Sequence, residues 1–289
     1  MLVVDDVAKL RAILKPWKSN NVSIGFVPTM GNLHAGHLSL INRAKDEADK
    51  VVASIYVNPL QFDRPDDLSR YPRTLEDDLQ SLETDGVDVV FTPSDKMIYP
   101  DGIEMSTKVD VPVISRILCG AHRPGHFVGV ATVVCKLFNM VEPDVAIFGE
   151  KDFQQLMLIR RMTEDLNLPV KVLGAETLRE ENGLAMSSRN NYLSAEERDT
   201  AATIYRMLRS LAERLAGGDQ YYPGLESDGK ALLEAAGFIP DYVSVLRKID
   251  LQQPAPEEPV KDLVIVCAAI LGNARLIDNL QLSHYLAAR

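Results

Sequence analysis

The sequence predicts an α/β protein in which a parallel sheet with helices on both faces is followed by a smaller α+β unit. Short apolar runs rich in Val, Ile and Phe alternate with amphipathic stretches, which is the pattern of strand–helix–strand units. Soon after Lys171 the composition shifts to a polar, Asn- and Ser-rich segment. We therefore expect one domain at residues 1–175 and a second at residues 176–289.

Buried strands are expected in the first domain, because each apolar run is short and is bounded by Gly, Pro or Asp. The strand candidates are Ile24–Val27, Val51–Val57, Val87–Phe91, Val145–Phe148 and Val170–Leu173. Apolar residues at helical spacing predict helices at His37–Asp49 and Thr74–Thr84. In such Rossmann-like sheets, ligands bind beyond the carboxyl ends of the strands, so functional residues are sought in the loops that follow strands.

The second domain begins with a strongly predicted helix at Ser194–Leu215. Ser194 and Glu197 have the spacing of a capping box at its start, and Gly217–Gly218 follows its end. Further along, Tyr242–Leu246 and Leu263–Ala269 read as strands. This mixture predicts a compact α+β unit.

Composition and charge exclude several function classes. Hydrophobic residues make up 46% of the 289 residues, and the formal net charge is −10, so a broad basic surface for nucleic acid is not expected. The apolar run Leu263–Leu271 is much shorter than the roughly 20 residues that a membrane-spanning helix needs. Asp5 and Asp6 stand where a secretory signal has basic residues. We expect no membrane partner.

Cysteine spacing argues against a disulfide framework or a thiolate metal site, and histidine spacing argues against a catalytic zinc. Cys119, Cys135 and Cys267 lie far apart without a CxxC pair, which is typical of reduced thiols in a cytoplasmic protein. His122 and His126 are four residues apart, but the Pro and Gly between them disfavour a helix that would present both to zinc.

The first motif with chemical content is VPTMGNLHAGH at residues 27–37, directly after a strand. His34 and His37 flank Gly36 where a helix begins, and unpaired backbone N–H groups at a helix start attract phosphates. Histidine can donate hydrogen bonds to phosphate oxygens, and glycine lets a nucleotide approach closely. The alternative is a turn with two surface histidines.

The second motif is GLAMSSRN at residues 183–190. Two hydroxyl groups and the guanidinium of Arg189 could close over a triphosphate and stabilise departing pyrophosphate. Taken alone, such a polar segment is more often a solvated loop.

Together these motifs resemble the pantothenate synthetase (pantoate–β-alanine ligase) family, within the wider group of HxGH nucleotidyltransferase-like enzymes. The matching stretches run along almost the whole chain: PTMGNLHAGHLSLI, SIYVNPLQFDRPDDLSRYPRTLEDD, RPGHFVGVATVVCKLFNMVEPDVAIFGEKDFQQLMLIRRM, GLAMSSRNNYLS and LGNARLIDN. One departure is Asn182, where the family usually has Asp.

The resemblance implies an ATP-dependent ligase that works in two steps. The pantoate carboxylate attacks the α-phosphorus of ATP and releases pyrophosphate. The β-alanine amine then attacks the acyl carbon of pantoyl adenylate and releases AMP, giving pantothenate for coenzyme A biosynthesis. A carboxylate is a poor acyl donor without a leaving group, so catalysis should consist mostly of positioning and cationic stabilisation.

The resemblance also implies residue roles. His34 and His37 would contact the ATP phosphates with His37 as proton donor, and Lys151, Ser187, Ser188 and Arg189 would complete the catalytic set. Other ATP contacts would come from Met30, Gly31, Gly36, Gly149, Glu150, Asp152, Leu178 and Met186. Pantoate and β-alanine would be held by Asn58, Gln61, Gln155 and Arg123. Without the family match, Lys151 and the glutamines would read as ordinary surface residues.

Mg²⁺ is expected to bridge the ATP phosphates, because it keeps several waters and needs few protein ligands. Asp77 and Asp78 are candidate ligands, although such an acidic pair on a helix is more often a solvated face. The family resemblance further implies a homodimer.

Three other functions share parts of these motifs. A cofactor adenylyltransferase would release a nucleotidyl product, and a non-catalytic regulator would bind ATP without turnover. A tRNA synthetase relative would be longer and would need a basic anticodon-binding region, which this acidic chain lacks.

Overall fold

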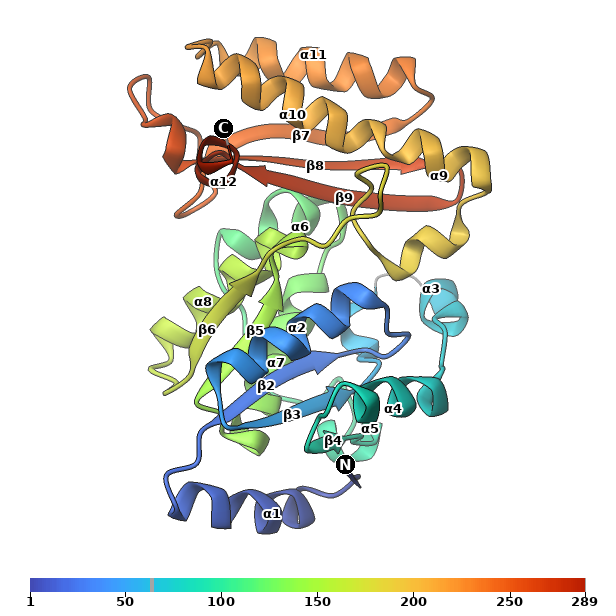
Figure 1. Ribbon diagram of the computed structural model, residues 1–289, viewed down its shortest axis with the longest axis vertical. Coiled ribbons are helices and arrows are strands. Elements are labelled where there is room, and N and C mark those ends of the chain that lie inside the picture. Colours follow the sequence, from blue (N-terminus) through green and yellow to red (C-terminus); the bar gives the residue numbers. More distant parts are fainter. Residues whose placement is uncertain (63–64, 289) are drawn as a thin grey trace. The chain divides into compact units, whose positions relative to one another are not determined.

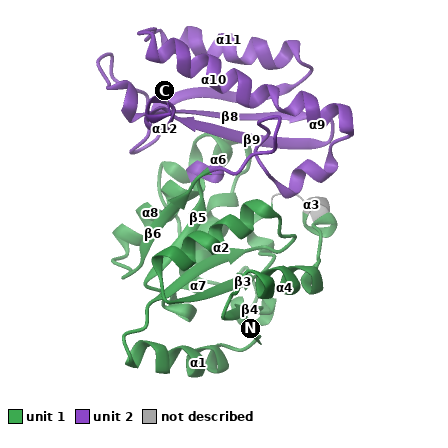
Figure 2. Ribbon diagram, viewed as in Figure 1, with its two compact units in different colours: residues 1–150, 155–176 green, residues 151–154, 177–289 purple. Residues whose placement is uncertain are grey.

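The computed structural model describes residues 1–62 and 65–288, and the chain divides into two compact units (Figure 1 and Figure 2). The first comprises Met1–Glu150 and Gln155–Glu176, and the second comprises Lys151–Gln154 and Thr177–Arg289. The short stretch Lys151–Gln154 is thus grouped with the C-terminal residues, although it directly follows a strand of the first unit. The prediction of an α/β fold with a smaller α+β region is confirmed.

The first unit is built on a parallel sheet with the strand order β1-β4-β3-β2-β5-β6. Its strands are β1 (Leu2–Val4), β2 (Ile24–Thr29), β3 (Lys50–Ile55), β4 (Val89–Phe91), β5 (Val145–Gly149) and β6 (Lys171–Ala175). The central strands are mostly apolar and almost wholly buried, as expected for a parallel sheet covered on both faces. The strand order reverses direction between β2 and β5, so their carboxyl ends form a switch point where ligands are expected.

Helices of the first unit follow the strands. They are α1 (Val7–Ser19), α2 (Ala35–Glu47), α3 (Pro65–Arg70), α4 (Leu75–Thr84), α5 (Asp95–Ile98), α6 (Cys119–His122) and α7 (His126–Val141), with 3₁₀ turns η1 (Pro59–Gln61) and η2 (Ile114–Arg116). The 3₁₀ turn η3 (Glu150–Asp152) and the start of α8 (Phe153–Asp165) include Lys151–Gln154, which group with the second unit, while the rest of α8 belongs to the first. Helix α2 packs on β5 and β2, and Leu40, Ile41 and Ala44 supply its buried face. This packing fixes the start of α2 at the switch point.

The second unit is an antiparallel sheet covered by helices. The strands β7 (Ile239–Arg247), β8 (Leu263–Leu271) and β9 (Ala274–Gln281) pair in that order. The helices are α9 (Ala195–Ala201), α10 (Thr203–Ala216), α11 (Tyr222–Ala235) and α12 (Leu282–Ala287), with 3₁₀ turns η4 (Ser188–Tyr192) and η5 (Val260–Asp262). Buried residues of α10, including Met207 and Leu211, share one core with β8.

One predicted element is corrected by the structure. The single helix expected at Ser194–Leu215 is interrupted at Ala202, where ψ is −14°, and forms α9 and α10 instead. The hydroxyl of Thr200 donates to the carbonyl of Glu196, a local bond that competes with regular helix geometry. The predicted capping box is present: Glu197 N–H donates to Ser194 Oγ (3.2 Å) and Ser194 N–H donates to Glu197 Oε2 (2.8 Å).

Within the described part of the chain, no helix combines the length and the apolar character that crossing a bilayer requires.

Candidate active site

The segment between β2 and α2 holds its two histidines in a reciprocal cap. His34 is the N-cap residue, and its Nδ1 accepts from Gly36 N–H at 3.1 Å. His37 Nδ1 lies 3.4 Å from the backbone N–H of His34, and the two ring centroids are 4.1 Å apart. Because each Nδ1 accepts a hydrogen bond, the proton of each neutral ring is on Nε2. The cap therefore turns both imidazoles into Nε2–H donors at a helix start.

Asp78, which is distant in sequence, holds the backbone of this segment by hydrogen bonds. Its carboxylate, which is 3% exposed, accepts from Asn32 N–H (2.9 Å), Leu33 N–H (2.8 Å) and the Thr74 hydroxyl (3.2 Å). Gly31 has φ = +78°, and a Cβ there would lie 2.8 Å from Asp78 Oδ2. A glycine is thus required where the chain turns over the buried carboxylate.

This environment bears on the two carboxylates considered for Mg²⁺. Asp77 is exposed, whereas Asp78 is buried and accepts hydrogen bonds on both oxygens, so the solvated-face alternative is wrong for Asp78. Among the described residues there is no group of three or more His, Cys, Asp or Glu side chains arranged to hold a metal ion.

The segment after β3 places Asn58 and Gln61 beside the first motif. Asn58 is 1% exposed, and its Nδ2 donates to Gln61 Oε1 at 3.1 Å. Gln61 Nε2 donates in turn to Met30 Sδ at 3.1 Å. The end of α6 and the start of α7 hold the backbone of the same segment, because the carbonyl oxygen of Gln61 accepts hydrogen bonds from Arg123 Nη2 (3.3 Å) and His126 Nδ1 (2.7 Å). Met30, Asn58, Gln61 and Arg123 therefore form one connected group.

His126 begins α7, whereas His122 ends α6, with Gly125 at φ = +84° between the two helices. The predicted absence of a continuous helix between the two histidines is confirmed.

At the end of β5 the chain enters η3 and then α8. Gly149 ends the strand next to β2, and Glu150 and Lys151 follow it directly. The Lys151 side chain is 17% exposed and lies 4.0 Å from a carboxylate oxygen of Asp152. The carbonyl of Lys151 accepts from Asn279 Nδ2 at 3.0 Å. Gln155, in the first turn of α8, is half-buried.

Residues 178–190 form a turn that we call the flap, and the second motif, residues 183–190, is its C-terminal half. An isolated bridge pairs Arg179 with Ala185, and Met186 N–H donates to the Leu178 carbonyl at 3.0 Å. Asn182 Oδ1 accepts from Leu184 N–H at 3.0 Å. An aspartate can make the same turn, so the Asn182 substitution preserves the local geometry.

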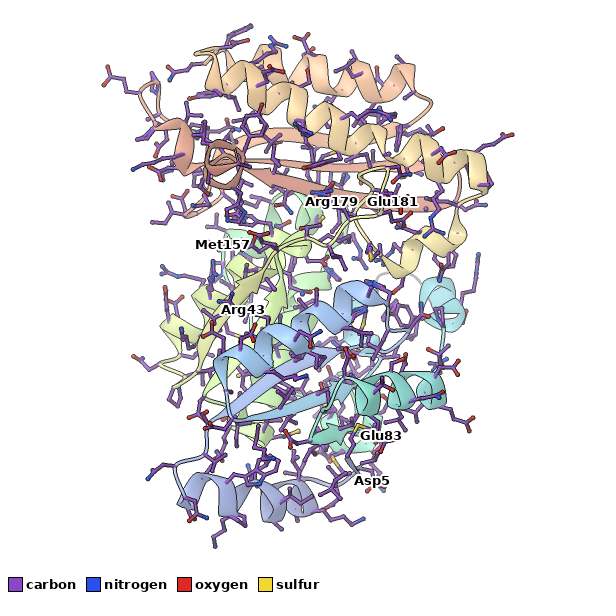
Figure 3. All side chains as sticks on the ribbon, in the orientation of Figure 1. Asp5, Arg43, Glu83, Met157, Arg179 and Glu181 are labelled. Carbon is purple, nitrogen blue, oxygen red and sulfur yellow. The ribbon has the colours of Figure 1, made fainter. Side chains whose placement is uncertain are left out.

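Two ion pairs anchor the flap within its own unit. Arg179, labelled in Figure 3, pairs with Asp278 of β9 through both guanidinium arms at 2.6 and 3.0 Å and lies 3.7 Å from the Tyr205 ring centroid. Glu180 accepts from Arg198 at 2.9 and 2.7 Å. The Arg198 hydrogen bonds lower the pKa of the Glu180 carboxyl, partly opposed by burial. These ion pairs therefore fix the N-terminal residues of the flap, Arg179 and Glu180, to β9 and α9.

The polar side chains of the second motif lie at the C-terminal end of the flap, at the start of η4. Ser187 caps η4 by accepting from Arg189 N–H at 3.2 Å, and Ser187, Ser188 and Arg189 are half-buried. The His34 and His37 pair belongs to the first unit and Arg189 to the second. Their convergence on one triphosphate stays a prediction.

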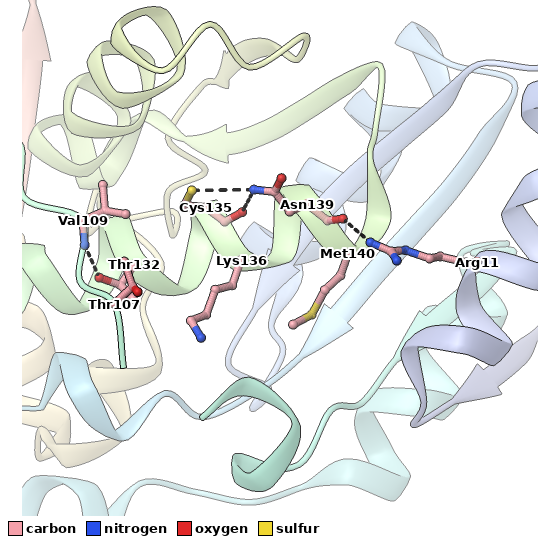
Figure 4. A pocket seen from close by; sticks show the side chains of 8 residues that line it. All are labelled: Arg11, Thr107, Val109, Thr132, Cys135, Lys136, Asn139 and Met140. Carbon is pink, nitrogen blue, oxygen red and sulfur yellow. Dashed lines mark hydrogen bonds between the residues drawn. The ribbon is translucent and has the colours of Figure 1, made fainter. Parts of the chain in front are cut away.

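A pocket of about 330 Å³ lies elsewhere, along α7 (Figure 4). It is lined by Arg11, Thr107, Val109, Thr132, Cys135, Lys136, Asn139 and Met140, none of which belongs to the predicted site. Lys136 Nζ donates to the Ile98 carbonyl at 2.6 Å and sits 5.2 Å from the Tyr99 ring centroid.

Sequence reasoning missed two features that support the site: the buried residue Tyr99, and the hydrogen bonds that Asp78 accepts from the first motif. Tyr99 donates to Asn58 Oδ1 at 2.6 Å across 41 residues of sequence, and Asp78 reaches Asn32 across 46. Neither belongs to a local motif, so the sequence contained no periodic or spacing signal for these contacts.

Comparisons with known proteins identify the family. Residues 2–281 match the family model described as pantoate-beta-alanine ligase. Curated relatives named pantothenate synthetase are 55% identical in Thioalkalivibrio sulfidiphilus and 51% identical in Pseudomonas putida, each over 97% of both chains. A crystal structure of pantothenate synthetase from Thermus thermophilus superimposes with a TM-score of 0.89 at 45% identity, covering 98% of this chain and 99% of the other.

A further solved structure is the pantoate-beta-alanine ligase of Francisella tularensis, complexed with a β,γ-ATP compound and β-alanine. It matches with a TM-score of 0.80 at 36% identity over 98% of both chains. The family model and the relatives cover nearly the whole chain, so the predicted ligase is confirmed against the adenylyltransferase and regulator alternatives. The chain belongs to the pantoate–β-alanine ligase family.

Proposed function

We propose how the residues of this chain carry out the reaction of its family. The chain is an ATP-dependent ligase that condenses pantoate with β-alanine through pantoyl adenylate, releasing pyrophosphate and AMP. The observation that supports our assignment of roles most strongly is the reciprocal cap of His34 and His37, which engages the Nδ1 atom of each ring and leaves Nε2 as the N–H donor at a helix start.

In the first step, a pantoate carboxylate oxygen bonds to the α-phosphorus, and the bond to the bridging oxygen of pyrophosphate breaks. Negative charge grows on the phosphates as this happens. His34, His37 and Lys151 stabilise that charge by hydrogen bonds and by the compact ammonium group. The backbone at Met30 and Gly31, together with Gly36, leaves room for the nucleotide.

The remaining ATP contacts come from the end of β5 and from the flap. Gly149, Glu150 and Asp152 lie along the ribose side, and Leu178 and Met186 approach the adenine. The Met186 N–H is committed to the Leu178 carbonyl, so adenine would meet other backbone groups of this pair. Ser187, Ser188 and Arg189 cover the triphosphate.

Pantoate is held by amides. Gln61 and Gln155 bind its oxygen atoms, Asn58 supports Gln61, and Arg123 lies at the same segment, where it can meet pyrophosphate or the β-alanine carboxylate. Neutral amides bind a hydroxy acid without repelling its negative charge.

In the second step, the β-alanine amine attacks the acyl carbon and AMP departs. Water would compete for the same carbon, so the adenylate has to be shielded. We assign this shielding to residues 176–289 as a lid over the catalytic residues of 1–175.

Mg²⁺ bound by the ATP phosphates would supply further charge neutralisation, with at most a weak contribution from Asp77. We also propose a homodimer, which sedimentation would reveal as a mass of about twice 32.0 kDa. A cytoplasmic location is proposed on the cysteine usage of the sequence.

The reaction is tested by omitting one substrate at a time. ATP with pantoate should release pyrophosphate in an amount close to that of the enzyme, and AMP should appear in free solution only after β-alanine is added. A stable dinucleotide-like product, or ATP binding without turnover, would contradict this function.

A further inference from the structure

We propose that Tyr99 is a positioning residue which, acting through Asn58, fixes the Gln61 side-chain amide so that it offers N–H donors, and not its carbonyl, to the substrate. The inference rests on the proposed role of Gln61 in binding pantoate. It adds a residue outside the sequence motifs and gives the site a preference for acceptor atoms on the ligand.

Two backbone groups favour one orientation of the Asn58 amide, and the Tyr99 hydroxyl reinforces it. Its Oδ1 faces the backbone N–H of Leu60 at 3.3 Å, which can only donate, and its Nδ2 faces the carbonyl of Gly129 at 3.1 Å, which can only accept. Exchanging the oxygen and nitrogen of this amide would set donor against donor and acceptor against acceptor. With 1% exposure, Asn58 has no solvent to relieve such a conflict.

The orientation of Gln61 follows from that of Asn58. Asn58 Nδ2 is a donor, so the Gln61 atom 3.1 Å away is its acceptor, Oε1. The Gln61 Nε2 group is thereby turned to the other side, where it donates to Met30 Sδ. A thioether sulfur is a weak acceptor, so a carboxylate or hydroxyl oxygen of a substrate can take its place.

Tyr99 is the third member of this hydrogen-bonded series, Tyr99–Asn58–Gln61, which we call the relay. Its hydroxyl donates to Asn58 Oδ1 at 2.6 Å, much shorter than the Leu60 contact, and its side chain is 3% exposed. Burial, with a smaller contribution from Asp95, raises the pKa of Tyr99, so the hydroxyl stays a donor throughout the working range. Lys136 lies over the ring and holds the adjoining Ile98 carbonyl.

The backbone of Gln61 is fixed by a separate set of contacts. His126 and Arg123 bond its carbonyl, and Gly129 packs so closely that a Cβ there would lie 2.5 Å from the Leu60 carbonyl oxygen. These contacts remain when the Tyr99 hydroxyl is removed. The hydroxyl therefore acts on the direction of the Gln61 amide and not on the course of the chain.

Tyr99→Phe tests the relay because it keeps the ring beneath Lys136 and removes only the hydroxyl. We expect the KM for pantoate to rise about tenfold, within the range that misplacement of a binding group produces, while the KM values for ATP and β-alanine change less than about twofold. Tyr56→Phe is the matched control, since Tyr56 is also buried and donates to Asp95, outside the relay.

A purely structural role would lower the melting temperature of Tyr99→Phe without a change specific to pantoate. That result, or an equal pantoate effect in the Tyr56→Phe control, would overturn the relay. If the wild-type enzyme turns over pantoate normally, such a failure leaves the proposed function intact. If the wild type does not use pantoate, both proposals fall.

Gln61→Glu tests the donor assignment independently of Tyr99. The carboxylate can still accept from Asn58, but it donates only when protonated. We expect kcat/KM for pantoate, divided by the wild-type value to cancel shared groups such as His126, to rise as the pH falls from 8 to 5. The slope should approach about tenfold per pH unit above the carboxyl pKa. A flat ratio, or activity equal to wild type at pH 8, would contradict the donor assignment.

Discussion

At the scale of single residues, the site depends on which atom of each side chain is left to face the substrate. His34 illustrates this, because Nδ1 serves the start of α2 and Nε2 is directed elsewhere. A protonated ring would carry a hydrogen on Nδ1 and lose the cap. In this tautomer the Nε2–H of His34 can donate a hydrogen bond to a phosphate oxygen.

The two functions of His34 can be separated by substitution. His34→Asn keeps an oxygen that can cap the helix but cannot reach as far as Nε2, so stability should change by less than about 0.5 kcal/mol while kcat/KM for ATP falls about 10²-fold. His34→Gln should show the reverse balance, with about 1 kcal/mol of stability lost and more activity retained. Thermal unfolding and steady-state kinetics measure both quantities. Full activity in His34→Asn would refute the phosphate role.

The adjacent carboxylates offer a matched pair. Both oxygens of Asp78 accept hydrogen bonds, so Asp78→Asn sets an amide N–H against a backbone N–H and should cost about 1–3 kcal/mol, with a raised KM for ATP. Asp77→Asn, on the exposed face, should change stability by less than about 0.5 kcal/mol. A shifted Mg²⁺ requirement in Asp77→Asn would show that this carboxylate is a metal ligand.

At the scale of elements, helices and strands were predicted most accurately where a single local sequence pattern determines the structure. The strands β2, β3 and β5 are mostly apolar and buried, and the start of α9 has its own capping box. Strand β9 was missed because ARLIDNLQ mixes charged and apolar residues, and its pairing with β8 decides its conformation. The same holds for the site residues. The two local motifs could be recognised in the sequence, whereas Tyr99 and Asp78 act through contacts with residues distant in sequence.

The flap is the element whose stability should depend on pH. The pKa of Glu180 is lowered from its ordinary value of 4.5, chiefly by hydrogen bonds from Arg198. A carboxyl whose pKa is lower in the folded state stabilises the fold above the unfolded pKa and loses that contribution as the pH falls through the folded pKa. The protection factors of the flap amides, which correct for the pH dependence of intrinsic exchange, should therefore fall as the pH drops below about 4.5, and Glu180→Gln should show the same reduced protection at pH 7. Wild-type protection factors that are equal at pH 7 and at pH 4 would disprove this anchor.

At the scale of the whole molecule, both units contribute to adenylate formation, with His34 and His37 from the first and Lys151 and Arg189 from the second, and we assign the shielding of the adenylate to residues 176–289. Arg189→Lys keeps a positive charge but loses the planar guanidinium fork, so we expect kcat to fall about 10- to 100-fold. The remaining turnover should release more pantoyl adenylate into solution, measured as pyrophosphate formed in excess of pantothenate. Unchanged kinetics would refute the lid.

The central claim is that the imidazoles of His34 and His37 and the guanidinium of Arg189 act on the same triphosphate. A crystal structure of this enzyme with pantoate and a non-hydrolysable ATP analogue measures this directly. We predict both Nε2 atoms and at least one guanidinium nitrogen within about 3.5 Å of phosphate oxygens of a single nucleotide. A nucleotide bound away from the histidines, or a flap whose Arg189 faces solvent while the nucleotide is bound, would contradict the claim.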